Sequence, residues 1–116
     1  MIGSTISGRD EPTPGMAKGY VYAWEFRVPL ESREAFERHY GAEGSWVQLF
    51  RRAPGYIGTL LLEDRTTPGR YLTIDRWQDE AAYVAFRAAF SRQYDALDRE
   101  CAALTTDERL LGTFKE

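Results

Sequence analysis

Two aromatic side chains on one expected strand are the residues of this sequence whose types and spacing first suggest chemistry. Tyr22 and Trp24 lie two positions apart in the stretch 20–28, so in a β-strand both side chains point to the same face. Their rings can stack on an aromatic ligand, and their hydroxyl and indole N–H groups need partners when buried. We interpret this face as the floor of a small-molecule pocket; an ordinary aromatic core is the alternative.

A base and further hydrogen-bonding groups are expected on neighbouring elements. His39 is the only histidine of the chain. Its ordinary pKa of about 6.5 makes it the candidate catalytic base for a phenol or an enol that must lose a proton. Tyr40 and Arg76 are further candidates for binding the substrate, because each can donate a hydrogen bond to an oxyanion. A surface or capping role for His39 is the alternative interpretation.

The composition narrows the range of partners and sites. The chain has 116 residues, enough for one domain, and its net charge of −3 arises from interleaved acidic and basic residues. We therefore expect no nucleic acid as a partner. The longest aliphatic run, 60–62, is far too short for a membrane helix, so no membrane partner is expected. Cys101 is the only cysteine, which agrees with a cytoplasmic location. A zinc site usually needs several His or Cys ligands, and this chain offers only Cys101 and His39 in different segments, so we expect no metal site.

The first half of the chain predicts an arm, a strand and a broken helix. Residues 1–18 contain several glycines and prolines but no aromatic residue, which predicts a flexible N-terminal arm ahead of a domain over 19–116. After the first strand, Ser32 is a candidate N-cap for a helix. Two glycines ahead of Ser45 should interrupt this helix, and Ser45 is the expected cap of its second piece.

The second half predicts a hairpin followed by a long helix and a closing strand. Residues 56–63 and 70–77 are rich in β-branched, aliphatic and aromatic residues and flank a Thr-Thr-Pro-Gly turn. The strand over 70–77 should be central and packed on both faces, with Asp75 and Arg76 at its wetter end. Asp79 is a candidate N-cap for one long helix, whose apolar stripe continues to position 104.

The order of these elements is β-α-β-β-α-β. It is typical of an α+β ferredoxin-like sandwich, in which two helical segments cover one face of an antiparallel sheet. The other face of the sheet would expose a larger apolar patch than monomers normally tolerate. We therefore expect a second copy of the chain to cover it in a homodimer.

Three segments of the sequence, taken together, resemble a known family. YVYAWEFRV, FRRAPGYIGTLLLED and RYLTIDRWQDEAAYVAF are similar in order and spacing to the antibiotic biosynthesis monooxygenase family of dimeric α/β barrels. The similarity covers residues 20 to about 114, and PGY at 54–56 and DRW at 75–77 are its most specific parts. The resemblance implies a homodimer whose two sheets pack face to face, with a small-molecule pocket between the sheet and the helices of each subunit.

Two hypotheses for function follow from this resemblance. The first is a cofactor-independent monooxygenase that oxidises an aromatic or polyketide-like small molecule by letting a substrate carbanion react with O₂. Haem-degrading relatives carry a histidine on the second helix, where this chain offers Phe86, Phe90 and Tyr94, so we expect neither haem degradation nor a cofactor. The chain also contains no Asn, the residue type thought to assist the anthrone oxygenases. The alternative is therefore a non-catalytic dimeric module that binds a hydrophobic or aromatic small molecule.

Overall fold

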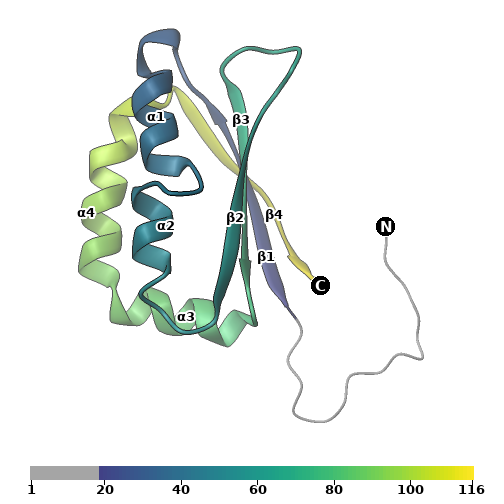
Figure 1. The fold of residues 1–116 in the computed structure, drawn as a ribbon, viewed down its shortest axis with the longest axis vertical. Helices are drawn as coiled ribbons and strands as arrows, with labels where there is room; N and C mark the ends of the chain where they lie inside the picture. Colours follow the sequence, from purple (N-terminus) through teal and green to yellow (C-terminus); the bar gives the residue numbers. More distant parts are fainter. Residues whose placement is uncertain (1–18) are drawn as a thin grey trace.

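The fold is built on a four-stranded antiparallel sheet with the helices on one of its faces (Figure 1). This computed structural model describes residues 19–116, and the arm expected over 1–18 lies outside the described residues. The strands are β1 (Tyr20–Arg27), β2 (Tyr56–Glu63), β3 (Arg70–Trp77) and β4 (Asp107–Lys115), in the spatial order β2-β3-β1-β4. Every neighbouring pair is antiparallel, which confirms the predicted ferredoxin-like sandwich.

The first helical segment is interrupted at glycines, as the sequence predicts. It consists of a 3-10 turn (Leu30–Ser32), α1 (Arg33–Tyr40) and α2 (Ser45–Phe50). Gly41 and Gly44 both lie in the turn between the two helices. The interruption lets α1 and α2 lie along the same face of the sheet (Figure 1), and each helix has its own buried apolar residues.

The expected helix caps are confirmed in part. Asp79 occupies the N-cap position of the third helix and its side chain accepts a hydrogen bond from the Ala82 N–H. Ser32 occupies the N-cap position of α1 but makes no capping hydrogen bond. The cap expected at Ser45 is wrong, because Gly44 occupies that position and the Ser45 hydroxyl lies 2.8 Å from Nδ1 of His39.

The second helical segment consists of two helices, so the predicted single long helix is wrong. α3 (Glu80–Ala89) and α4 (Ser91–Cys101) meet at Phe90, whose backbone is not helical, and a second 3-10 turn (Ala102–Leu104) follows. α3 crosses one end of the sheet and α4 runs beside α1 and α2 (Figure 1). The bend lets Phe86 of α3 pack on Trp77 while Tyr94 of α4 packs on Trp46. Packing therefore causes a bend that no glycine or proline marks.

The central strand, β3, carries both the core and a buried carboxylate. Tyr71, Thr73, Asp75 and Trp77 alternate along the strand, point towards the helices and are all buried. Asp75 is 6% exposed, so its predicted place at a wet strand end is wrong. The strand lies between β2 and β1 as predicted, but within this chain only one of its faces is buried.

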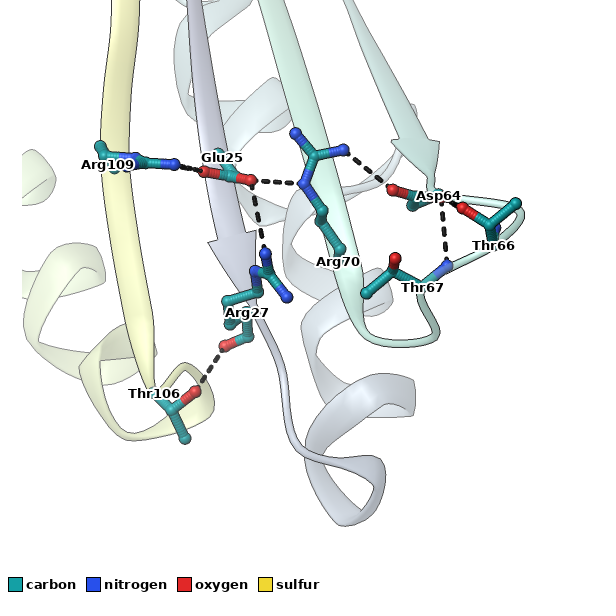
Figure 2. A network of polar contacts seen from close by, with 8 residues as sticks. All are labelled: Glu25, Arg27, Asp64, Thr66, Thr67, Arg70, Thr106 and Arg109. Carbon is teal, nitrogen blue, oxygen red and sulfur yellow. Dashed lines mark hydrogen bonds and ion pairs between the residues drawn. The ribbon is translucent and has the colours of Figure 1, made fainter.

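The sheet face that points away from the helices is apolar and uncovered in the single chain. Leu60 and Leu62 of β2 and Phe114 of β4 are between 44% and 54% exposed. Near one end of this face, Glu25 of β1 accepts hydrogen bonds from Arg109 of β4 and Arg70 of β3 (Figure 2).

These hydrogen bonds tie three strands together. The Arg109 and Arg70 guanidinium groups hold the pKa of the Glu25 carboxyl below its ordinary value. Arg70 also donates to Asp64 at the end of the β2–β3 hairpin, at 2.9 Å.

Each helix in the described part of the chain is too short or too polar to cross a lipid bilayer.

Candidate functional site

A cavity of about 380 Å³ lies between the sheet and the helices, and all four strands and all four α-helices contribute to its wall. Most of the wall is aromatic, formed by Tyr22, Trp24, Phe26, Tyr40, Trp46, Phe50 and Tyr94. The remaining side chains are polar or charged: Thr59, Thr73, Asp75, Arg87, Asp98 and Glu108. This volume and this mixture of aromatic walls with a few polar groups are typical of a small-molecule site.

Three of the five residues predicted for the site line this cavity. Tyr22 and Trp24 project from β1 and Tyr40 projects from the end of α1, so the strand face and the helix meet as expected. The ring centroid of Trp24 lies 6.4 Å from that of Phe26, on which it stacks, and the ring centroid of Tyr40 lies 5.0 Å from that of Phe26. Neighbouring rings thus fix the orientation of the aromatic wall.

The other two predicted residues, His39 and Arg76, are not among the side chains that line the cavity. Nδ1 of His39 lies 2.8 Å from the Ser45 hydroxyl, and Nε2 lies 3.7 Å from the Glu100 carboxylate. Arg76 donates two hydrogen bonds to the carboxylate of Glu116, at 3.0 and 2.9 Å. Both side chains therefore have partners elsewhere on the surface of the domain.

Asp75 is the carboxylate that the structure places in the cavity. Its Cα pairs with Tyr22 on β1 and with Thr59 on β2, so a polar side chain flanks it on each side. The Thr59 hydroxyl donates a 2.5 Å hydrogen bond to Oδ1 of Asp75. Because that hydroxyl has a single proton, the 2.6 Å contact between Tyr56 and Thr59 has the Tyr56 hydroxyl as its donor. The carboxylate is thereby held at the end of a short hydrogen-bonded chain.

Burial changes the acidity of Asp75. Removal from water disfavours the charged carboxylate and raises the pKa of Asp75 from 3.8 to about 6, although the Thr59 hydrogen bond opposes the shift. A carboxylate with this pKa is largely ionised at neutral pH and can accept a proton from a bound molecule. Partial desolvation, together with the nearby Asp98 carboxylate, raises the pKa of the Glu108 carboxyl on β4.

Two aromatic residues of the wall, Tyr22 and Trp46, carry a proton that no acceptor in the described part of the chain receives. The Tyr22 hydroxyl accepts a 3.3 Å hydrogen bond from Trp77 Nε1, and within residues 19–116 no acceptor receives its own proton. Burial raises the pKa of Tyr22 well above its ordinary value, so the hydroxyl stays protonated. Trp46 is 8% exposed, and its indole N–H is the one fully buried side-chain polar group in the described chain without a hydrogen-bond partner. An oxygen atom of a ligand in the cavity can accept the Tyr22 proton, whereas the Trp46 nitrogen is covered by protein atoms.

The helical side of the cavity contributes one cation, Arg87, and one carboxylate, Asp98. The Arg87 guanidinium of α3 lies 3.8 Å from the centroid of the Tyr94 ring and donates a 3.1 Å hydrogen bond to the Tyr83 hydroxyl. Asp98 of α4 lies in the same wall. The cavity therefore contains one cation and three carboxyl groups, and Asp75 is the most deeply buried of the three. Within residues 19–116, no group of three or more metal-ligating side chains comes together.

Sequence reasoning missed Asp75, Thr59 and Trp46. The alternation along β3 could have found Asp75, because it shares a face with Tyr71 and Trp77, large aromatic residues that are typical of a core, and side chains two positions apart point the same way. No local pattern could have found Thr59, whose role depends on its register opposite Asp75. The indole of Trp46 belongs to the apolar face of α2, and its lack of a partner becomes visible only in three dimensions.

Solved structures with the same fold cover nearly the whole domain. PA3566 from Pseudomonas aeruginosa has a TM-score of 0.67 at 19% identity, over 87% of this chain and 96% of that chain. SO0527 from Shewanella oneidensis has a TM-score of 0.66 at 20% identity, over 85% of this chain and 91% of that chain. SnoaB from Streptomyces nogalater, described as a cofactor-independent oxygenase, has a TM-score of 0.59 at 27% identity, over 86% of this chain and 94% of that chain.

The comparison of sequences identifies the family. No curated protein sequence matches the chain. The model of the antibiotic biosynthesis monooxygenase family matches residues 20–90, which contain β1, α1, α2, the β2–β3 hairpin and α3. This match covers more than half of the chain and includes most of the cavity wall, so the protein belongs to the antibiotic biosynthesis monooxygenase family.

Proposed function

We propose that this protein is a cofactor-independent monooxygenase that oxidises an aromatic, polyketide-like small molecule. The observation that carries the proposal is the cavity itself, which joins aromatic walls, the Tyr22 hydroxyl and the buried carboxylate of Asp75 in one space. Membership of the family and the likeness to SnoaB, a cofactor-independent oxygenase, support the same class of reaction.

In the proposed complex, the rings of Trp24 and Tyr40 hold the flat substrate and exclude water. Loss of a proton from the substrate places negative charge on an oxygen atom, which the Tyr22 hydroxyl can stabilise by donating its proton. Burial keeps the pKa values of Tyr22 and Tyr40 above the ordinary value, so both remain donors during the reaction. The substrate anion then reacts directly with O₂.

Oxygen uptake tests this proposal. Anthrone and 1-naphthol are incubated with the protein without added metal or flavin, and quinone formation is measured beside oxygen consumption. We expect one O₂ per quinone, and turnover reduced about 10²-fold in Tyr22→Phe, which loses one oxyanion donor. Tyr20→Phe is the matched control, because Tyr20 lies on the same face of β1 but does not line the cavity. Equal turnover in both variants would contradict the role given to Tyr22.

A binding module remains the second candidate function, and the position of His39 favours it. The base expected from the sequence does not line the cavity, and its Nδ1 is engaged with Ser45. If none of the tested aromatics is oxidised, but a naphthol quenches tryptophan fluorescence saturably in the wild type and not in Trp24→Ala, the module is the better description. The two functions thus differ in oxygen uptake and agree in binding.

We further propose that two copies of the chain pack through the uncovered sheet face. Leu60, Leu62 and Phe114 form an apolar surface there, which monomeric proteins rarely leave in contact with water. Light scattering of the full chain should give twice its mass of 13.3 kDa. A mass of one chain at micromolar concentration would reject the homodimer.

A further inference from the structure

Asp75 is a buried carboxylate that the fold does not neutralise. Glu25 of β1 and Asp64, which directly follows β2, each receive a guanidinium hydrogen bond. Asp75 receives only the Thr59 hydroxyl, although it is 6% exposed. Burying a carboxylate without a cation is unfavourable, so stability alone does not account for an aspartate at this position.

The geometry leaves one side of this carboxylate available to a ligand. Oδ1 accepts the 2.5 Å hydrogen bond from Thr59, and within the part of the chain that the structure describes no hydrogen bond reaches Oδ2. Asp75 also lines the cavity, beside the Tyr22 hydroxyl on the neighbouring strand. One oxygen is therefore fixed by the sheet, and the other remains free to accept a proton.

We infer that Asp75 is the catalytic base that removes a proton from the aromatic substrate, and that Thr59 positions its carboxylate. This inference rests on the proposed monooxygenase function and identifies the base within it. It assigns the role expected for His39 to a residue that lines the cavity. Thr59 does not touch the reacting atoms in this scheme; it acts through the orientation and the acidity of Asp75.

The chemistry balances with O₂ as the only co-substrate. For an anthrone, Asp75 takes one methylene proton, and the electron pair of that C–H bond stays on the substrate as a delocalised carbanion. O₂ adds to this carbon, a C–O bond forms, and Asp75 returns its proton to the resulting peroxide anion. Removal of the second methylene proton lets the electron pair of that C–H bond form the carbonyl group while the O–O bond breaks, and the departing hydroxide takes up this proton to become water. The carbon is oxidised by four electrons, and O₂ supplies the carbonyl oxygen and the oxygen of water.

Several charged groups face Asp75 across the cavity and must be separated from it experimentally. Arg87 of α3, Asp98 of α4 and Glu108 of β4 lie in the same wall, as do the hydroxyls of Tyr22, Tyr40 and Tyr94. Burial raises the pKa of these tyrosines above the ordinary value, which removes them from the neutral range. Glu108 is the group to control, because burial raises its carboxyl pKa as well.

The first test is the activity of Asp75→Asn, which keeps the shape of the side chain and removes the base. With the full-length protein, anthrone as substrate and oxygen uptake as readout, we expect a 10²-fold to 10⁴-fold loss of turnover. Naphthol binding, measured by tryptophan quenching, should change less than about threefold. Glu37→Gln is the matched control, because it also replaces a hydrogen-bonded carboxylate by an amide. Glu37 of α1 accepts a 2.5 Å hydrogen bond from Tyr71 of β3 but does not line the cavity.

The second test is the pH profile of turnover. Wild-type turnover should rise with pH through about 6, the pKa of Asp75. Thr59→Val removes the hydrogen bond that lowers this pKa, so the rising limb should move to higher pH. Glu108→Gln should leave the limb in place. A purely structural role for Thr59 would lower stability without moving the limb.

The outcomes separate the two levels of the proposal. If the wild type oxidises anthrone and the turnover of Asp75→Asn lies within threefold of the wild-type turnover, the assignment of Asp75 is overturned. The monooxygenase function then remains intact. The assignment of Asp75 is also overturned if the rising limb of the pH profile moves in Glu108→Gln and stays in place in Thr59→Val. Failure of the wild type to oxidise any anthrone or naphthol overturns the proposed function, and with it the role of Asp75. Circular dichroism of each variant confirms that the loss is not unfolding.

Discussion

Replacing Asp75 by Asn should stabilise the protein at neutral pH, although it removes a native hydrogen-bonding carboxylate. The folded-state pKa of Asp75 is about 6, above the ordinary 3.8, so the folded protein binds this proton more tightly than the unfolded chain. Wild-type stability therefore falls as pH rises between these two values. A shift of about two pKa units corresponds to about 3 kcal/mol at pH 7. Asn carries no charge, and its side-chain oxygen can still accept the Thr59 hydrogen bond.

Thermal denaturation of wild type and Asp75→Asn at pH 4.5 and pH 7.5 measures this effect. The expected gain at pH 7.5 is about 1–3 kcal/mol, reduced from the full value by imperfect packing of the amide. For a domain of this size, such a gain raises Tm by the order of 10 °C. The gain should shrink at pH 4.5, where the wild-type carboxyl is mostly protonated. Equal Tm values at pH 7.5, or a difference that does not depend on pH, would refute the reasoning.

Three further predictions concern the outer face and the cavity. Glu25→Gln should lower Tm at pH 7, because Arg109 and Arg70 lose their charged acceptor. Since the pKa of Glu25 is depressed in the folded protein, the difference in Tm between wild type and variant should fade as pH falls below about 4. An unchanged Tm at pH 7 would show that the network is not stabilising. Trp24→Ala should weaken naphthol binding while kcat changes little, because stacking acts on ground and transition states alike; a fall in kcat at constant KM would argue against a stacking role. Leu60→Asp should convert the expected dimer to a monomer in light scattering, since it places a charge in the apolar sheet face; a dimer that persists would locate the interface elsewhere.

The location of Asp75 shows how far the sequence allowed the site to be predicted. Tyr22 and Trp24 could be assigned to the cavity from their alternation in a single strand, and Tyr40 from the apolar spacing of α1. The base could not be assigned in this way. His39 was the obvious candidate because its ordinary pKa lies near neutrality, but the turn between α1 and α2 brings Ser45 against its ring. An aspartate becomes a candidate only when burial raises its pKa, and burial depends on the whole fold.

The bend at Phe90 illustrates the same limit for the fold. The apolar stripe of the second helical segment has a helical period throughout, so local propensity favours one rod. In the structure, Phe86 of α3 packs on Trp77 and Tyr94 of α4 packs on Trp46, so each helix covers its own tryptophan of the core. The chain therefore bends where packing requires it, at Phe90 and Ser91, where neither glycine nor proline stands.

The sequence by itself determined the order of the strands and helices, the extent of the β2–β3 hairpin and the aromatic face of β1. These features depend on patterns within a few residues: alternation in strands, helical spacing, and turn residues such as the Pro-Gly pair before Arg70. Only the tertiary structure decided which polar groups share the cavity. Asp75, Thr59 and Trp46 come from β3, β2 and α2, and their chemistry arises from cross-strand register and from the loss of water around them, which no segment of the sequence contains alone.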